Sequence, residues 1–171
     1  MTNTGVYMSV SVEGRGSDGE SEQLLTFILN GEEYGVDILC VQEIRGWSTP
    51  MPIPNTPPYI KGVINIRGDV VPIADLRERL GLPRQEYGLT TVVIVLRVQA
   101  SEGERVMGVV VDAMSDVTKV PASAIKAPPT FDESGDSALT KGIATLDTKM
   151  IAILDVRRIF GSALGPSKAA A

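Results

Sequence analysis

The sequence predicts an all-β protein made of two small barrels with short helical turns. Its apolar residues are rich in valine and isoleucine, and aromatic residues make up only 5% of the chain, which favours thin β-type layers. About ten apolar runs of strand length, separated by short turns, are typical of closed or partly closed barrels. One stretch of the chain also recurs, which indicates two similar lobes.

The recurring stretch runs from Gly62 to Gly81 and returns without gaps from Gly142 to Gly161. Each copy predicts a β-hairpin followed by a short helical turn that ends at the last glycine. We expect the apolar positions that the copies share to lie in the core. The identical pairs are Gly62/Gly142, Ile73/Ile153, Asp75/Asp155, Arg77/Arg157 and Gly81/Gly161, and the shared apolar pairs are Val63/Ile143, Ile66/Leu146, Val70/Met150, Val71/Ile151, Leu76/Val156 and Leu80/Phe160.

The copies differ at the hairpin turn, which makes that turn the better candidate for function. Within Arg67-Gly68-Asp69, Gly68 can adopt a positive φ at no steric cost. Pro72 cannot donate a ladder hydrogen bond, so it predicts an edge strand or a bulge. The first copy has Asn65, Arg67, Gly68 and Pro72 where the second has Thr145, Asp147, Thr148 and Ala152.

The chain before the first copy predicts a hairpin and a third strand. Leu24–Leu29 is the first strand, and Asn30-Gly31 is a strong signal for a hairpin that returns through 34–36. Asp37–Cys40 predicts a turn. In the following run, Val41 and Ile44 can both face the core only if a bulge intervenes, because side chains alternate along a strand.

Two further segments complete the first half. Residues 47–58 hold five prolines and predict an irregular loop. Residues 56–60 predict a single helical turn with Pro57 at its first position.

The second half predicts the remaining strands. Val92–Val98 is a near-continuous apolar run, typical of a strand buried on both faces. After a connection at 82–91, we expect strands at 106–111, 117–120 and within 144–153, an exposed loop at 128–137 and a helical turn at 155–160. A weak echo relates the halves, because Met107-Gly108-Val109 resembles Tyr34-Gly35-Val36, and Asp116 falls where Glu43 does, 73 residues earlier. Segments exchanged between the two lobes remain possible.

The ends of the chain predict tails around one double-lobed unit. We expect residues 1–21 to form a disordered tail, with a brief extended piece at 6–12, residues 22–161 to form the two lobes, and residues 162–171 to form a flexible tail. The start resembles no signal peptide, and no apolar run approaches the length that spans a bilayer. A net charge of −5 argues against nucleic acid or an anionic membrane as the partner.

Catalytic chemistry finds no support in the residue types. The chain has no histidine, which excludes a Ser-His triad and an imidazole metal site, so we expect no metal and no cofactor. The single Cys40 lacks an activating base and is interpreted as a buried structural thiol in a reducing cytosol. Asp75 and Asp155 repeat in matching places, which favours a shared capping role over paired carboxylates in catalysis. Arg67-Gly68-Asp69 also matches an integrin-recognition tripeptide, but three residues recur by chance.

Recognition of another protein is the remaining class. Val41, Glu43 and Arg67 are ordinary strand and turn residues on one interpretation. On the other, Arg67 offers five donors in a fixed fork to a partner's oxygens.

Four longer motifs favour a role in recognition of other proteins. NGEEYGVDILCVQEIRG, NTPPYIKGVINIRGDVVPIADLR, TVVIVL and GVVVDAMSDV resemble the CheW-like family, the coupling proteins of bacterial chemotaxis, in order from about Glu22 to Phe160. The resemblance implies two SH3-like five-stranded barrels without enzymatic activity. It also implies a cytoplasmic adaptor, held at the inner face of the membrane through receptor arrays. Its partners would be the cytoplasmic tip of methyl-accepting chemoreceptors, the CheW-like regulatory domain of the histidine kinase CheA and further copies in rings.

The resemblance also implies a receptor-binding groove between the lobes. Its motif positions in this chain are Val41, Glu43, Gly62, Asn65 and Arg67. The kinase-contact residues are left unassigned, because the second half matches by shorter pieces. A different class stays open beside the adaptor: a small-ligand sensor that holds a metabolite between its lobes.

Overall fold

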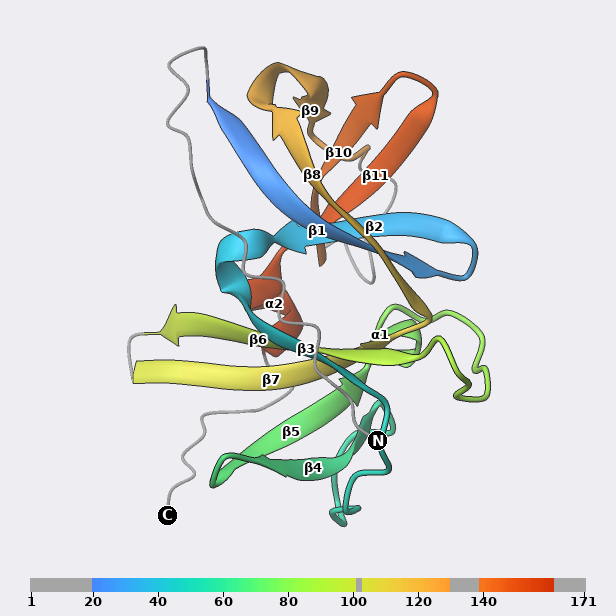
Figure 1. Cartoon of the computed structure of the whole chain (residues 1–171), viewed down its shortest axis with the longest axis vertical. Coiled ribbons are helices and arrows are strands. Elements are labelled where there is room, and N and C mark those ends of the chain that lie inside the picture. The colour runs from blue at the N-terminus through green and yellow to red at the C-terminus, as the bar shows by residue number, and fades with distance from the viewer. Residues whose placement is uncertain (1–19, 101–102, 130–138, 162–171) are drawn as a thin grey trace.

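The structure, a computed structural model, describes residues 20–100, 103–129 and 139–161, which form two curled sheets (Figure 1). Among the described residues, two short α-helices, α1 and α2, and the 3-10 turns η1 and η2 lie between or after the strands. This architecture confirms the predicted all-β fold of two barrel lobes. One sheet contains β1 (Ser21–Leu29), β2 (Glu32–Asp37), β8 (Ala113–Pro121), β9 (Ile125–Lys126), β10 (Thr140–Leu146) and β11 (Lys149–Leu154); the other contains β3 (Val41–Gly46), β4 (Ile60–Ile66), β5 (Asp69–Asp75), β6 (Val92–Ala100) and β7 (Gly103–Val111); the helical turns are η1 (Ile38–Cys40), α1 (Leu76–Arg79), η2 (Ala122–Ala124) and α2 (Val156–Phe160).

The strand orders show how the chain is shared between the lobes. The β1 sheet has the order β8-β1-β2-β11-β10-β9, and the β3 sheet has the order β3-β6-β7-β5-β4. The β3 sheet uses five consecutive strands, whereas the β1 sheet takes strands from both sides of them in the sequence. Each repeat copy therefore joins strands from the other half of the sequence, and the lobes do exchange segments.

Strand register confirms both the repeat and the weaker echo between the halves. In each sheet one row of paired residues crosses five strands and passes through a glycine, an isoleucine and a second glycine. The row of the β3 sheet is Gly62, Ile73, Gly108, Val95 and Glu43, and the row of the β1 sheet is Gly142, Ile153, Gly35, Thr26 and Asp116.

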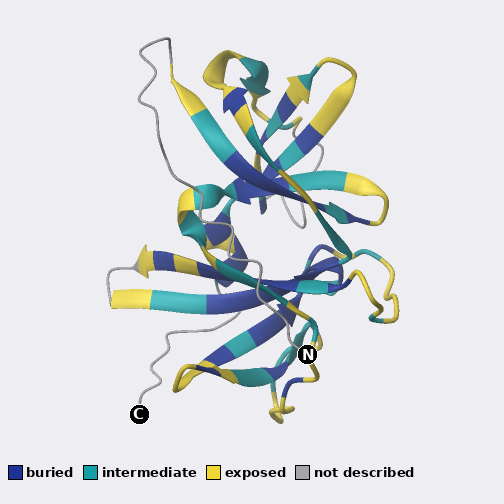
Figure 2. Cartoon of the chain, in the orientation of Figure 1, coloured by how far each residue is buried: buried dark blue, intermediate teal, exposed yellow. Residues whose placement is uncertain are grey.

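Buried side chains of the described residues form three clusters, two inside the lobes and one between them. Figure 2 shows where the buried residues lie along the strands. Ile73 belongs to the cluster of the β3 sheet and Ile153 to that of the β1 sheet. The largest cluster, which we call the central cluster, lies between the two sheets and joins them. It contains Leu25 and Phe27 of β1, Ile94 and Leu96 of β6, and residues of the helix α2. Because side chains alternate along each strand, one face fills a lobe and the other fills the space between lobes.

One prediction about the core is wrong. Val70 and Met150 match in the repeat, yet they are 67% and 60% exposed. Their neighbours Val71 and Ile151 are buried and point into the lobes, so the preceding side chain in each strand must point outward. A shared apolar residue is therefore not always a core residue.

Most local predictions hold. The turn at 37–40 is the 3-10 turn η1, capped by Asp37, and a bulge between Val41 and Glu43 lets Val41 and Ile44 both pack on the central cluster. Pro72 lies in the part of β5 that pairs with β4 alone, because β7 pairs only with 73–75.

The prediction of a helical turn at 56–60 is wrong. The segment makes a β-turn in which the Ile60 amide donates to the Pro57 carbonyl at 2.9 Å, and β4 begins at once. Residues 1–19 of the tail expected at 1–21, the tail expected at 162–171 and most of the loop expected at 128–137 lie outside the described residues. Ser21, the last residue of the first expected tail, already belongs to β1.

Candidate functional site

The bulge at the start of β3 sets the direction of the Glu43 side chain. Val41 pairs with Leu96 and Glu43 with the adjacent Val95, so Gln42 is the extra residue. Val41 is half-buried against the central cluster. The bulge thus keeps Val41 inside while it turns the Glu43 carboxylate towards the β4–β5 turn.

The turn between β4 and β5 carries Arg67 in a conformation that few residues adopt. Arg67 and Gly68 have φ values of 53° and 93°, which is the type I′ pattern of a two-residue hairpin. The Gly68 amide donates to Asn65 Oδ1 at 3.0 Å, so Asn65 stabilises this turn. The sequence predicted the positive φ at Gly68 but not at Arg67.

A salt bridge connects the two segments. Arg67 Nη1 donates to Glu43 Oε1 at 2.6 Å, and Arg45 Nη1 lies 3.4 Å from Glu43 Oε2. The Arg67 side chain is 65% exposed, so the pair adds little to folding stability, about 0–1 kcal/mol. The arrangement instead orients one carboxylate and two guanidinium groups at the surface.

Gly62 has a structural role in this lobe. Its φ is 141°, and a Cβ atom there would lie 2.1 Å from the carbonyl oxygen of Met51. Met51 and Val63 exchange two backbone hydrogen bonds of 2.9 Å, which fix the proline-rich loop against β4. Only a glycine lets the loop backbone approach this closely.

Of the five predicted site residues, the structure thus brings Glu43 and Arg67 into direct contact. Asn65 shapes the turn that presents Arg67, Val41 anchors the strand that presents Glu43, and Gly62 admits the neighbouring loop. Sequence reasoning missed Arg45, the second cation on Glu43, although its place two residues along the same strand puts it on the same face.

The other lobe presents a different charge pattern at the matching positions. Asp116 stands where Glu43 does, and Asp147 stands where Arg67 does. Asp147 repeats the positive φ of Arg67, at 55°. Two acidic residues cannot form a salt bridge with each other, so the matching positions of the described β1 sheet lack this pair.

A second cluster that the sequence did not suggest lies beside α1. The Tyr87 hydroxyl donates to Asp75 Oδ2 at 2.7 Å, and the Tyr87 ring packs against Trp47 with centroids 3.9 Å apart and ring planes tilted by 32°. Burial, followed by the hydrogen bond to Asp75, raises the pKa of Tyr87 well above its usual value. The other oxygen of Asp75 caps α1, as predicted.

The described segments contain neither a cluster of metal-ligating side chains nor a helix that could span a membrane. No three or more Cys, Asp or Glu side chains of residues 20–100, 103–129 and 139–161 gather to hold a metal ion. Among the same residues, none of the helices has the length and hydropathy needed to cross a membrane.

Comparisons with known proteins agree on one family. The model of the CheW-like domain matches residues 23–164. The chemotaxis protein CheW of Klebsiella aerogenes is 42% identical over 141 residues, 82% of each chain, and that of Bacillus subtilis is 33% identical over 138 residues, 81% of this chain and 86% of the relative.

A solved structure supports the same conclusion. The scaffolding protein TtCheW of Thermoanaerobacter tengcongensis superposes with a TM-score of 0.75 at 31% identity, covering 83% of this chain and 94% of that one. Sequence and fold therefore agree over the whole double-lobed unit, and this chain belongs to the CheW-like domain family.

Proposed function

We propose that this chain is a non-catalytic chemotaxis adaptor that couples methyl-accepting chemoreceptors to the histidine kinase CheA. The observation that carries the proposal is the family match across both lobes, with relatives that are named chemotaxis and scaffolding proteins. An adaptor needs at least two protein-binding faces and no reacting group, and two similar lobes with different surface charges supply such faces.

The receptor tip is proposed to bind at Val41, Glu43, Gly62, Asn65 and Arg67. Glu43 and Arg67 would make the polar contacts, because their charged groups lie at the surface of the β3 sheet, while the other three residues hold the backbone that presents them. CheA would bind elsewhere on the double-lobed unit through its CheW-like regulatory domain, and further copies of this chain would join in rings. Localisation at the inner face of the membrane would follow from the receptors.

Replacement of Arg67 tests this site. Arg67→Ala is expected to weaken receptor binding by about 1–3 kcal/mol, or about 5- to 150-fold, because a charge-assisted contact is lost. Alanine keeps the Cβ atom and the positive φ of the turn, so the melting temperature should hardly change. A pull-down titration with receptor-containing membranes measures the affinity.

The matched control is Arg84→Ala, which removes another exposed arginine on the same lobe. The prediction fails if both variants bind receptor equally well, or if Arg67→Ala lowers the melting temperature substantially.

Glu43 and Asp116 provide a second contrast, because they occupy matching positions in the two lobes. Glu43→Gln should reduce receptor-dependent activation of CheA, whereas Asp116→Asn should leave it near normal. Each change should cost less than about 1 kcal/mol of folding free energy, since both carboxylates border solvent. A reconstituted kinase assay measures activation, and equal losses at matched stability would remove Glu43 from the site.

The relatives give no support to the alternative that this chain is a small-ligand sensor, because their names refer to chemotaxis and scaffolding. A metabolite screen by thermal shift still separates the classes, because a bound ligand raises the melting temperature by mass action.

A further inference from the structure

The two short helices begin in the same way and place one arginine at the same position. Asp75 caps α1 and Asp155 caps α2, and each Oδ1 accepts a hydrogen bond from the amide of the second residue after it. Those residues are Arg77 and Arg157, with amide-to-oxygen distances of 2.9 and 3.0 Å. The two guanidinium groups can therefore be compared directly.

Arg77 is buried in a polar network in which each of its three guanidinium nitrogens donates a hydrogen bond. Its Nη1 donates to Asp112 Oδ2 at 2.6 Å, its Nη2 to Asn30 Oδ1 at 3.3 Å and its Nε to the Pro83 carbonyl at 2.8 Å. Asn30 lies in the β1–β2 turn and Asp112 connects β7 to β8, so the network joins the helix of one lobe to the other lobe. We call these residues the Arg77 network.

Strand register identifies the counterparts of this network around Arg157. Gly108 and Asp116 match Gly35 and Glu43 at a constant spacing of 73 residues, so the counterpart of Asp112 is Leu39. Val95 and Thr26 match at a spacing of 69 residues, so the counterpart of Asn30 is Gln99. The arginine and the amide are thus retained, and the carboxylate is replaced by a leucine.

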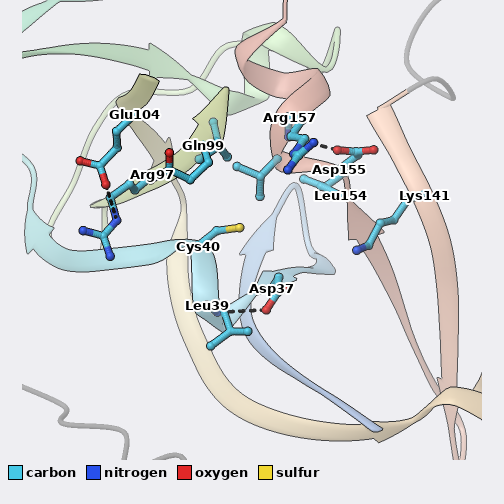
Figure 3. A pocket seen from close by; sticks show the side chains of 12 residues that line it. Asp37, Leu39, Cys40, Arg97, Gln99, Glu104, Lys141, Leu154, Asp155 and Arg157 are labelled. Carbon is cyan, nitrogen blue, oxygen red and sulfur yellow. Dashed lines mark hydrogen bonds and ion pairs between the residues drawn. The ribbon is translucent and has the colours of Figure 1, made fainter. Parts of the chain in front are cut away.

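The three counterparts line one pocket of about 620 Å³ where η1, the β6–β7 hairpin and α2 meet (Figure 3). In this view Gln99 and Arg157 lie on one side of the pocket and Leu39 on the other. Leu39 is 72% exposed. The pocket therefore lies at the place where Leu39 stands instead of a counterpart to the Asp112 carboxylate.

The other charged groups of the pocket already have partners. Arg97 pairs with Glu104 at 3.3 Å, and Lys141 lies 3.9 Å from Glu22. Asp37 accepts from the Leu39 amide, and Asp155 caps α2 and pairs with Arg158. In contrast, the Arg157 guanidinium makes no hydrogen bond or ion pair with any residue that the structure describes.

We infer that this pocket receives an Asp or Glu side chain of a partner protein, held by Arg157 and Gln99 as Asp112 is held by Arg77 and Asn30. We infer a protein segment as the occupant because the counterpart carboxylate, that of Asp112, is also supplied by a protein segment, the connection between β7 and β8. Exposed Leu39 offers an apolar contact to the residues that flank the acid. None of these residues belongs to the proposed receptor site, so the inference does not depend on that site.

The segment that carries Asp112 supplies the probe. A blocked peptide of residues 110–114, Val-Val-Asp-Ala-Met, is titrated to about 10 mM into the isotope-labelled full chain and followed by NMR. We expect shifts at Leu39, Gln99 and Arg157. Binding should be at least about threefold weaker for the same peptide with Asn in place of Asp, and equally weakened for Arg157→Ala with the original peptide.

A second variant keeps the test informative. Leu39→Asp restores the missing carboxylate within the chain and is expected to abolish peptide binding, whereas Leu39→Asn should not. Both changes lie at an exposed position, so the fold should persist. The inference is overturned if the Asp and Asn peptides shift the same residues equally, if neither shifts them, or if acetate and succinate shift them as strongly as the peptide.

Discussion

Replacing Ile73 or Ile153 with alanine is expected to lower the free energy of unfolding by about 2–5 kcal/mol in each case. Both side chains are fully buried, one in each lobe, and they occupy the same place in the paired rows of the two sheets. Ile73 fills the space beside Gly108, where a Cβ atom would lie 2.7 Å from Ile73 Cδ1. Truncation leaves a cavity there that the closely packed strands cannot close.

Equilibrium urea unfolding measures these effects, and Val70→Ala and Met150→Ala are the matched controls. The controls lie in the same strands but point to solvent, so each should change stability by less than about 0.5 kcal/mol. The central cluster joins the lobes, and we therefore expect one cooperative transition. An isoleucine variant within about half a kcal/mol of the unchanged protein would break the equivalence of the two positions.

The repeat made much of this fold predictable. The two hairpins have equal spacing, which implies equal strand registers, and the structure has them. An aspartate at the same position in each copy implies equal helix caps, which the structure also has. What the repeat could not give is the sharing of strands between lobes. That arrangement depends on β2 pairing with β11 and β5 with β7, and such parallel long-range pairs leave no periodic pattern in the sequence.

The candidate site was predictable only in part. The turn signal and the motif placed Arg67 at the surface, but its contact with Glu43 joins residues 24 positions apart in different strands. That contact depends on the bulge at Val41 and on the positive φ of Arg67. The Arg77 network shows the same limit, because its members come from three segments that meet only when both lobes are folded.

Asp112→Ala is expected to destabilise the protein by about 3 kcal/mol, the lower end of the range for breaking a buried ion pair. The change leaves the Arg77 guanidinium, which is only 8% exposed, without its carboxylate. The backbone contacts of Asp112 to Ile28 and Thr90 survive in the variant, so the loss reports the side chain. Leu39→Ala, the same truncation at the matching position of the other lobe, should cost less than about 0.5 kcal/mol because no buried partner is abandoned.

A double-mutant cycle with Arg77→Met and Asp112→Leu then isolates the pair. The double variant should lose clearly less than the sum of the two single losses, because it removes both charges together and leaves no uncompensated ion. The loss in Asp112→Ala should also change little with salt, since a pair shielded from solvent is weakly screened, unlike the exposed bridge between Arg67 and Glu43. Strictly additive single losses would mean that Arg77 and Asp112 stabilise the junction of the lobes independently, and the comparison with Arg157 would lose its basis.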